Sequence, residues 1–168
     1  MTTFANLWRS TRAAAAVEMA LVLPLLLILV FGCLELGNYF MDEHYLVKAV
    51  RDGARYAARQ DYSDYSSCSG SPGGTVVSDT TALIKTTILS GGTDQLANMS
   101  GLTVNVQVTC ATTAGGTALT GIYSQMTTGA PIVTVTVSLP YTPLFNSFGF
   151  KGGGLSLNAT QQAAVMGL

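Results

Sequence analysis

The sequence contains few charged residues. Lys, Arg, Asp and Glu make up 10% of its 168 residues, whereas about a quarter of an ordinary soluble domain is charged. The mean hydropathy is positive, so a membrane segment is expected. The formal net charge of -1 leaves no basic surface that would bind nucleic acid, and we expect proteins as partners. The length suits one domain with a separate helix.

Histidine and cysteine are also scarce. The only histidine is His44, and the three cysteines are Cys33, Cys68 and Cys110. They are too far apart for the close ligand pairs of a structural zinc site. The sequence has no Gly-x-Ser-x-Gly elbow and no Walker glycine loop with its Lys. We therefore expect no metal, no cofactor and no enzymatic activity, with the carboxylates acting as solvated surface groups.

A long hydrophobic run lies near the N-terminus. Within residues 13–34 the only charge is Glu18, and about 20 apolar residues in a helix cross a bilayer core. Arg9 and Arg12 precede the run, whereas Glu35 follows it. The positive-inside rule then predicts an N-terminus in the cytoplasm and the remainder of the chain outside.

Strong helix formers continue beyond this run, which predicts one helix from Ala14 to Arg59. Its second half is amphipathic, because charged residues lie mostly opposite one apolar face. The residues of the apolar face are Leu46, Ala49 or Val50, Gly53, and Tyr56 or Ala57. This face needs a cover, whereas the first half of the helix would be covered by lipid.

The remainder predicts an α+β domain. YSDYSSCSGSPGG, residues 62–74, favours a loop, and a second helix is expected from about Asp79 to Leu89, with Asp79 or Ser78 as N-cap and Gly91 and Gly92 beyond its end. Apolar and polar residues alternate in LTVNVQVTC, residues 102–110, and in IVTVTVSL, residues 132–139, and LSLNATQQAAV, residues 155–165, is a weaker strand. We expect an antiparallel sheet of about three strands, packed on the amphipathic half of the long helix.

Two cysteines lie in this polar remainder. Outside the cytoplasm an oxidising compartment would allow Cys68 and Cys110 to form a disulfide. The alternative is two buried free thiols, because the sequence does not show that the residues are close in space. The disulfide is the favoured interpretation.

An acidic residue inside the hydrophobic run needs an explanation. An Asp at the centre of a membrane helix costs about 2.5 to 3.5 kcal/mol on insertion scales, so Glu18 is expected to have a cationic partner. Alternatively, Glu18 lies near the cytoplasmic edge and extends towards Arg12 or Arg9.

Pro24 predicts a bend in the helix, although prolines also occur in ordinary membrane helices. Glu35 either pairs with a neighbouring protein or simply lies at the outer membrane surface.

The residues around Glu18 resemble the leader of a type IV prepilin: arginines, a run of small residues, a Glu and a long apolar helix. In that superfamily a membrane peptidase cuts after a small residue, usually Gly, and the new N-terminus lies four residues before the Glu. Matched residue by residue, Ala13 is the last leader residue and Ala14 the first mature one. The resemblance implies that Glu18 neutralises the α-amino group of Ala14, in its own subunit or the next, and sets the register of assembly.

A closer resemblance is to TadE-like pseudopilins of the tight-adherence (Tad, Flp) pilus systems. AAAAVEMALVLPLLLILVFGCLELG has that family's small residues, Val-Glu pair and apolar run with a proline. AVRDGARYAAR, residues 49–59, resembles the family's juxtamembrane helix. Ala13 stands in place of the usual Gly, and Met19 in place of the aromatic residue after the Glu.

The resemblance implies a pilin-like fold and a minor pseudopilin that acts in pilus initiation, priming or tip assembly for adhesion. Its expected partners are the membrane, a prepilin peptidase, sibling pilins or pseudopilins and the pilus assembly platform. The expected location is the bacterial inner membrane with the C-terminal domain extracytoplasmic, extending to the pilus or cell surface. The expected divisions are a cytoplasmic leader at 1–13, a transmembrane helix at 14–36, its continuation at 37–60 and an outer domain at 61–168.

Two other interpretations stay open. An uncleaved inner-membrane scaffold of the pilus secretion machinery would keep the leader. A lipid-anchored binding module would use Val30-Phe31-Gly32-Cys33 as a lipobox, with Cys33 as its acylated N-terminus. Intact mass distinguishes the three proteins, because their chains begin at Ala14, Met1 and Cys33 respectively.

Overall fold

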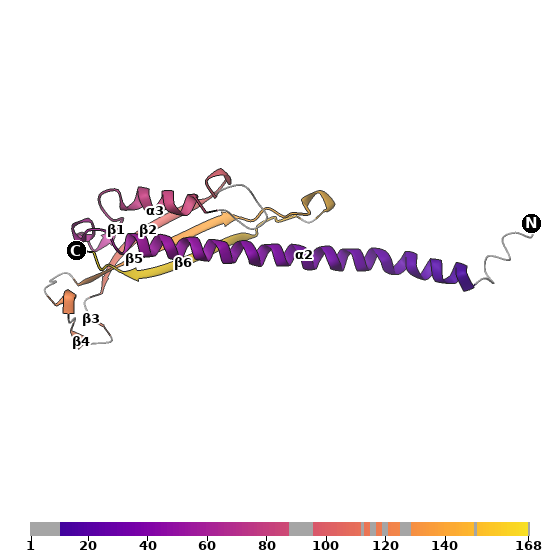
Figure 1. The fold of residues 1–168 in the computed structure, drawn as a ribbon, viewed down its shortest axis with the longest axis horizontal. Helices are drawn as coiled ribbons and strands as arrows, with labels where there is room; N and C mark the ends of the chain where they lie inside the picture. Colours follow the sequence, from indigo (N-terminus) through magenta and orange to yellow (C-terminus); the bar gives the residue numbers. More distant parts are fainter. Residues whose placement is uncertain are drawn as a thin grey trace, which may run out of the picture.

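One helix determines the length of the molecule. In the computed structural model, α2 (Thr11–Ala57) runs without interruption for 47 residues, or roughly 70 Å at 1.5 Å per residue. Its second half carries the folded domain, while its first half projects beyond it (Figure 1). The structure describes residues 11–87, 96–111, 113–114, 117–118, 121–124, 129–149 and 151–167.

The domain is built on an antiparallel sheet with the order β1-β2-β5-β6. Its strands are β1 (Ser69–Gly70), β2 (Thr103–Ala111), β5 (Ala130–Pro140) and β6 (Ser156–Ala164). Val106 of β2 lies opposite Val135 of β5, and Val137 of β5 lies opposite Ala159 of β6. The remaining elements are α3 (Val76–Lys85), the pair β3 (Thr113–Ala114) and β4 (Thr117–Ala118), and the short helices η1 (Tyr62–Tyr65), η2 (Leu96–Asn98), η3 (Gly121–Tyr123) and η4 (Asn146–Phe148).

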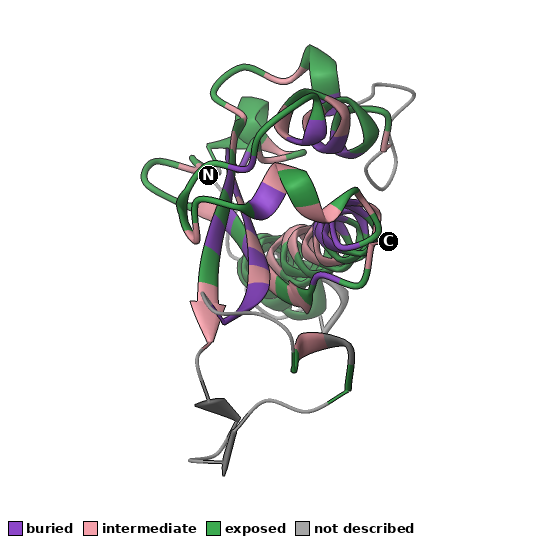
Figure 2. Cartoon of the chain, turned by 90° about the vertical axis from the view of Figure 1, so that its left-hand side faces the viewer, coloured by how far each residue is buried: buried purple, intermediate pink, exposed green. Residues whose placement is uncertain are grey.

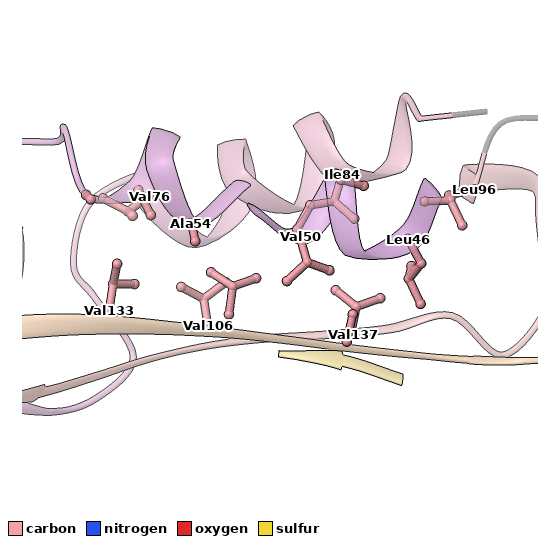
Figure 3. Packing of buried hydrophobic residues seen from close by; sticks show 14 of the residues in the cluster. Leu46, Val50, Ala54, Val76, Ile84, Leu96, Val106, Val133 and Val137 are labelled. Carbon is pink, nitrogen blue, oxygen red and sulfur yellow. The ribbon is translucent and has the colours of Figure 1, made fainter. Parts of the chain in front are cut away.

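One face of the sheet is covered by the two α-helices, and this interface is the core (Figures 2 and 3). Alternation along the strands explains it, because successive side chains point to opposite faces. In β5, Val133, Val135 and Val137 are fully buried, whereas Thr134 and Thr136 face the other side. The helix contributes Leu46, Val50, Ala54 and Ala57 to the same cluster. The predicted packing of the amphipathic half of the helix on the sheet is confirmed.

Several predicted boundaries are wrong. α3 begins at Val76 instead of Asp79 and ends at Lys85 instead of Leu89. Its start is earlier because the Val76 side chain is buried in the core. Neither predicted N-cap holds: the residue before the helix is Thr75, whose side chain makes no capping hydrogen bond. The expected end at Gly91 and Gly92 lies outside the described residues.

The stretch predicted as a loop after α2 contains structure. It holds η1 and the edge strand β1, which pairs with β2. α2 itself ends at Ala57, two residues before the predicted Arg59. The buried Tyr65 hydroxyl donates a hydrogen bond to the Ala57 carbonyl at the end of the helix, which also accepts one from the Gln60 amide. Burial raises the pKa of Tyr65 to about 12, so its hydroxyl stays protonated at neutral pH.

Close packing of α2 against α3 depends on the glycine at position 53. A Cβ atom there would lie 2.9 Å from both Cγ1 and Cδ1 of Ile84, whereas a Cβ at Gly37 would meet nothing within 4 Å. Relative to Gly37→Val, Gly53→Val should therefore lower the free energy of unfolding by about 1–3 kcal/mol. Thermal unfolding of the full chain in detergent, followed by tyrosine circular dichroism, measures this difference. Equal stability of the two variants would contradict it.

Candidate functional site

The N-terminal half of α2 is an exposed apolar surface. Every residue from Ala14 to Val30 is exposed, and by length and composition the helix can cross a membrane. A core helix of a soluble protein would pass the same test, but it would be buried by its own chain. None of the most apolar window of α2 is buried.

The predicted cleavage and assembly residues lie at the beginning of this surface. Ala13 and Ala14 are in the first turns of α2, and the exposed Glu18 follows Ala14 by four residues. Residues at this spacing are neighbours on one helix face, so a cut after Ala13 would place the new amine one turn from the carboxylate. The alternative partners, Arg9 and the side chain of Arg12, lie outside the described residues.

Two further predicted features lie within the apolar half. α2 continues through Pro24, and a bend on transfer from the bilayer to a filament stays a prediction. Cys33 is exposed and carries a free thiol. Within the described residues, no group of three His, Cys, Asp or Glu side chains gathers where it could hold a metal ion.

A cluster that the sequence did not predict lies where the apolar half of α2 ends. We call it the Glu35 cluster, made of Glu35, Asn38, Tyr39 and Asp42 of α2 with Tyr141, Leu144 and Phe145 of the β5–β6 connection. Oε1 of Glu35 accepts hydrogen bonds from the Tyr141 hydroxyl at 2.5 Å and the Leu144 amide at 3.1 Å. Oε2 accepts one from the Phe145 amide at 3.1 Å. One carboxylate thus holds the connection against the helix.

Tyr141 is the centre of this cluster. Its hydroxyl accepts a hydrogen bond from Nδ2 of Asn38 at 3.2 Å, and the same amide group lies 3.3 Å from Oδ2 of Asp42. Its ring packs edge-on against Tyr39, with ring centroids 5.1 Å apart. Burial is the main reason that the pKa of Tyr141 is raised to about 12, and the neighbouring Glu35 carboxylate raises it further. The hydroxyl therefore remains a donor to Glu35 at neutral pH.

Aromatic rings extend the contact one turn towards the N-terminus. The Phe31 ring lies 5.1 Å from that of Phe145 and 5.8 Å from that of Phe148, measured between centroids. The connection thus touches α2 on both sides of Glu35, through rings before it and through Tyr141 after it.

Glu35 has partners that the sequence did not indicate. Its carboxylate accepts hydrogen bonds within its own chain, and pairing with a neighbouring protein stays a prediction. Its partners lie 106 to 110 residues away along the sequence, and local patterns do not show such pairings. The aromatic residues of YTPLFNSFGF, residues 141–150, were the only available signal.

A disulfide joins Cys68 and Cys110, with Cα atoms 5.0 Å apart. It connects the segment after α2 to the end of β2, next to the pairing of Ser69 with Thr109. The bridged residues are 42 positions apart, and closing a loop of this size stabilises a fold by about 4 kcal/mol in the chain-entropy model. Such bonds persist in oxidising compartments, which suggests a domain outside the cytoplasm.

Comparison with known families bears on the helix. The model of the family described as TadE-like protein matches residues 13–55. Residues 13–55 form a TadE-like domain. The TadE-like domain begins at the proposed last leader residue, includes Glu18, Pro24 and Glu35, and ends two residues before α2 does. No curated protein and no solved structure matches the chain.

The Glu35 cluster can be tested by removing its carboxylate. Glu35→Ala leaves the Leu144 and Phe145 amides without their acceptor, so hydrogen exchange at both should accelerate. The free energy of unfolding should fall by about 1–3 kcal/mol, the usual cost of an unpaired polar group. Exchange measured by mass spectrometry on the full chain in detergent reports both effects.

The matched control is Glu43→Ala, two turns further along the same helix and outside the Glu35 cluster. It should leave exchange at the two amides unchanged. Glu35→Gln retains one acceptor oxygen and should lie between the wild type and Glu35→Ala. Unaltered exchange in Glu35→Ala would contradict the role of this carboxylate.

Proposed function

We propose that the protein is a minor pseudopilin of a Tad-type pilus, which acts in pilus initiation, priming or tip assembly for adhesion. The observation that carries the proposal is the TadE-like match over residues 13–55. It falls on a helix whose first half is apolar and exposed and whose second half is packed into an α+β domain. This division suits a subunit that is inserted in a membrane and presents a folded domain outside it.

The proposed orientation has the N-terminus in the cytoplasm of a bacterium, α2 crossing the inner membrane over residues 14–36, and the domain outside. Arg9 and Arg12 immediately before the apolar run support this direction, because Lys and Arg next to a membrane span favour its cytoplasmic side. The disulfide between β2 and the segment after α2 supports it independently.

The role proposed for the helix is structural. Its exposed apolar half would contact lipid before assembly and sibling pilins or pseudopilins afterwards. A prepilin peptidase would cut between Ala13 and Ala14, and the freed amine would pair with Glu18 of the same or the next subunit. Pairing offsets the cost of burying the two charges only when contact is close, so a subunit out of register would be disfavoured.

Two alternative functions would give mature chains with different N-termini. An uncleaved scaffold of the assembly platform would keep Met1. A lipid-anchored module would start at Cys33 and lose Phe31, together with its ring contacts to Phe145 and Phe148. Loss of these contacts favours the pseudopilin over the lipid-anchored module.

Intact mass of the chain, expressed with and without a Tad-type prepilin peptidase, tests the proposed cleavage. The mass should correspond to a chain that begins at Ala14 only when the peptidase is present. Ala13→Gly should be cut at least as completely, and Ala13→Leu should stay uncut because the enzyme requires a small residue. A full-length chain in all cases would support the scaffold, and an acylated Cys33 would support the lipid-anchored module.

Glu18→Ala and Glu18→Gln test the assembly role. Both variants should insert in the membrane and be cleaved, yet fail to enter sheared pili or to copurify with sibling pilins, because the Ala14 amine loses its counter-charge. Asp52→Ala, on the exposed side of α2 beyond the membrane, is the control and should assemble. Normal incorporation of Glu18→Ala would rule out the proposed pairing.

A further inference from the structure

The β5–β6 connection extends beyond the sheet towards the N-terminal half of α2 (Figure 1). Its turn η4 lies beside Phe31, as the ring contacts of Phe145 and Phe148 with Phe31 require. Phe31 precedes Glu35 by four residues, or about 6 Å along the helix axis. The tip of the connection is therefore level with the last turn of the apolar run.

This tip is apolar and uncovered. Leu144 is 60% exposed and Phe148 is 71% exposed. A groove of about 350 Å³ lies beside it and continues the apolar surface, and among the described residues that line it Glu35 alone is charged. The lining residues are Gly32, Glu35, Leu36, Tyr39, Tyr141 and Leu155.

The polar groups near the tip suit a membrane interface. Unpaired backbone groups are costly in the hydrocarbon region, and Glu35 accepts hydrogen bonds from the Leu144 and Phe145 amides. The exposed Lys151 follows Phe148 by three residues. A Lys at this position can extend its ammonium group to lipid phosphates while its stem contacts apolar surface.

We propose that residues 144–148 insert into the outer interface of the bilayer that α2 crosses, so that lipid covers the exposed tip. The apolar surface of the tip is continuous with that of α2, and this favours lipid over a second copy of the chain as its cover. A bilayer that covers the helix up to Glu35 also reaches the rings of Phe145 and Phe148, which lie beside Phe31. The expected depth of about 5–10 Å is that of interfacial apolar segments. Helix and tip together would fix the height and rotation of the domain above the membrane.

The inference rests on the proposed insertion of α2, and the experiment separates the two. The one native tryptophan, Trp8, is replaced by Phe, and single tryptophans are introduced as Leu144→Trp, Phe148→Trp, Leu25→Trp and Met166→Trp. Each full-length variant is reconstituted in phosphatidylcholine vesicles, with or without bromine on the acyl chains. Leu25 reports on insertion of α2, because it is exposed near the middle of the apolar run.

Met166→Trp is the matched control. Met166 is 62% exposed, but its amide is bonded to the carbonyl of Ala58 at the opposite end of the domain. Ala58 is roughly 40 Å along the helix from Phe31 at 1.5 Å per residue. The fluorescence of the tryptophan at position 166 should therefore be the same in vesicles with and without brominated acyl chains.

Fluorescence at positions 144 and 148 should be lost with bromines near the headgroup end of the chain, and less with bromines near the methyl end. Position 25 should show the reverse order. Quenching at 25 without quenching at 144 and 148 would overturn the inference and leave the proposed function intact. Shielding of 144 and 148 from aqueous iodide without bromine quenching would mean that protein covers the tip, which also overturns it. Absence of quenching at 25 would overturn both.

Discussion

A single continuous helix has to satisfy two different surroundings, and the hydrogen bonds of Glu35 lie where one gives way to the other. From Ala14 to Val30 every residue of α2 is exposed and only Glu18 is charged; beyond Asp42 the apolar face of the helix is buried against the sheet. A charge at this boundary would be poorly solvated on one side. Three donors from the β5–β6 connection satisfy it and fix that connection to the helix at the same time. The position of the domain along α2 follows from this contact and from the core above it.

The parts of the fold that follow local rules were predictable from the sequence. Alternation in residues 132–139 predicted the buried face of β5, and the spacing of Leu46, Val50 and Gly53 predicted the buried face of α2, which packs on the sheet and on α3. The start of α3 was not predictable in this way. The helix begins at Val76, whose side chain is buried in the core, and local sequence patterns do not show that burial. The edge strand β1 was missed because two residues give no periodicity, and it is defined by pairing with β2.

The candidate site divides in the same way. Glu18 was predicted as a functional residue because a carboxylate inside an apolar run is unusual. Glu35 follows such a run, where a carboxylate is ordinary, so its position did not predict its hydrogen-bond partners. Its importance arises from Tyr141, Leu144 and Phe145, which folding brings across more than a hundred residues. The partner proposed for Glu18 would be created by cleavage, so neither the sequence nor the fold of one uncleaved chain contains it.

The strands of the sheet run alongside α2 (Figure 1), and this direction has a mechanical consequence. Force applied along the helix, as when a subunit is drawn out of a bilayer, would load the helix–sheet interface in shear. Its buried contacts would then have to slide together, and no single edge could peel first. At the far end, the Met166 amide is hydrogen-bonded to the Ala58 carbonyl, and the disulfide joins the segment after α2 to β2. The helix can therefore transmit a pulling force along its axis to the domain while the domain stays attached to it.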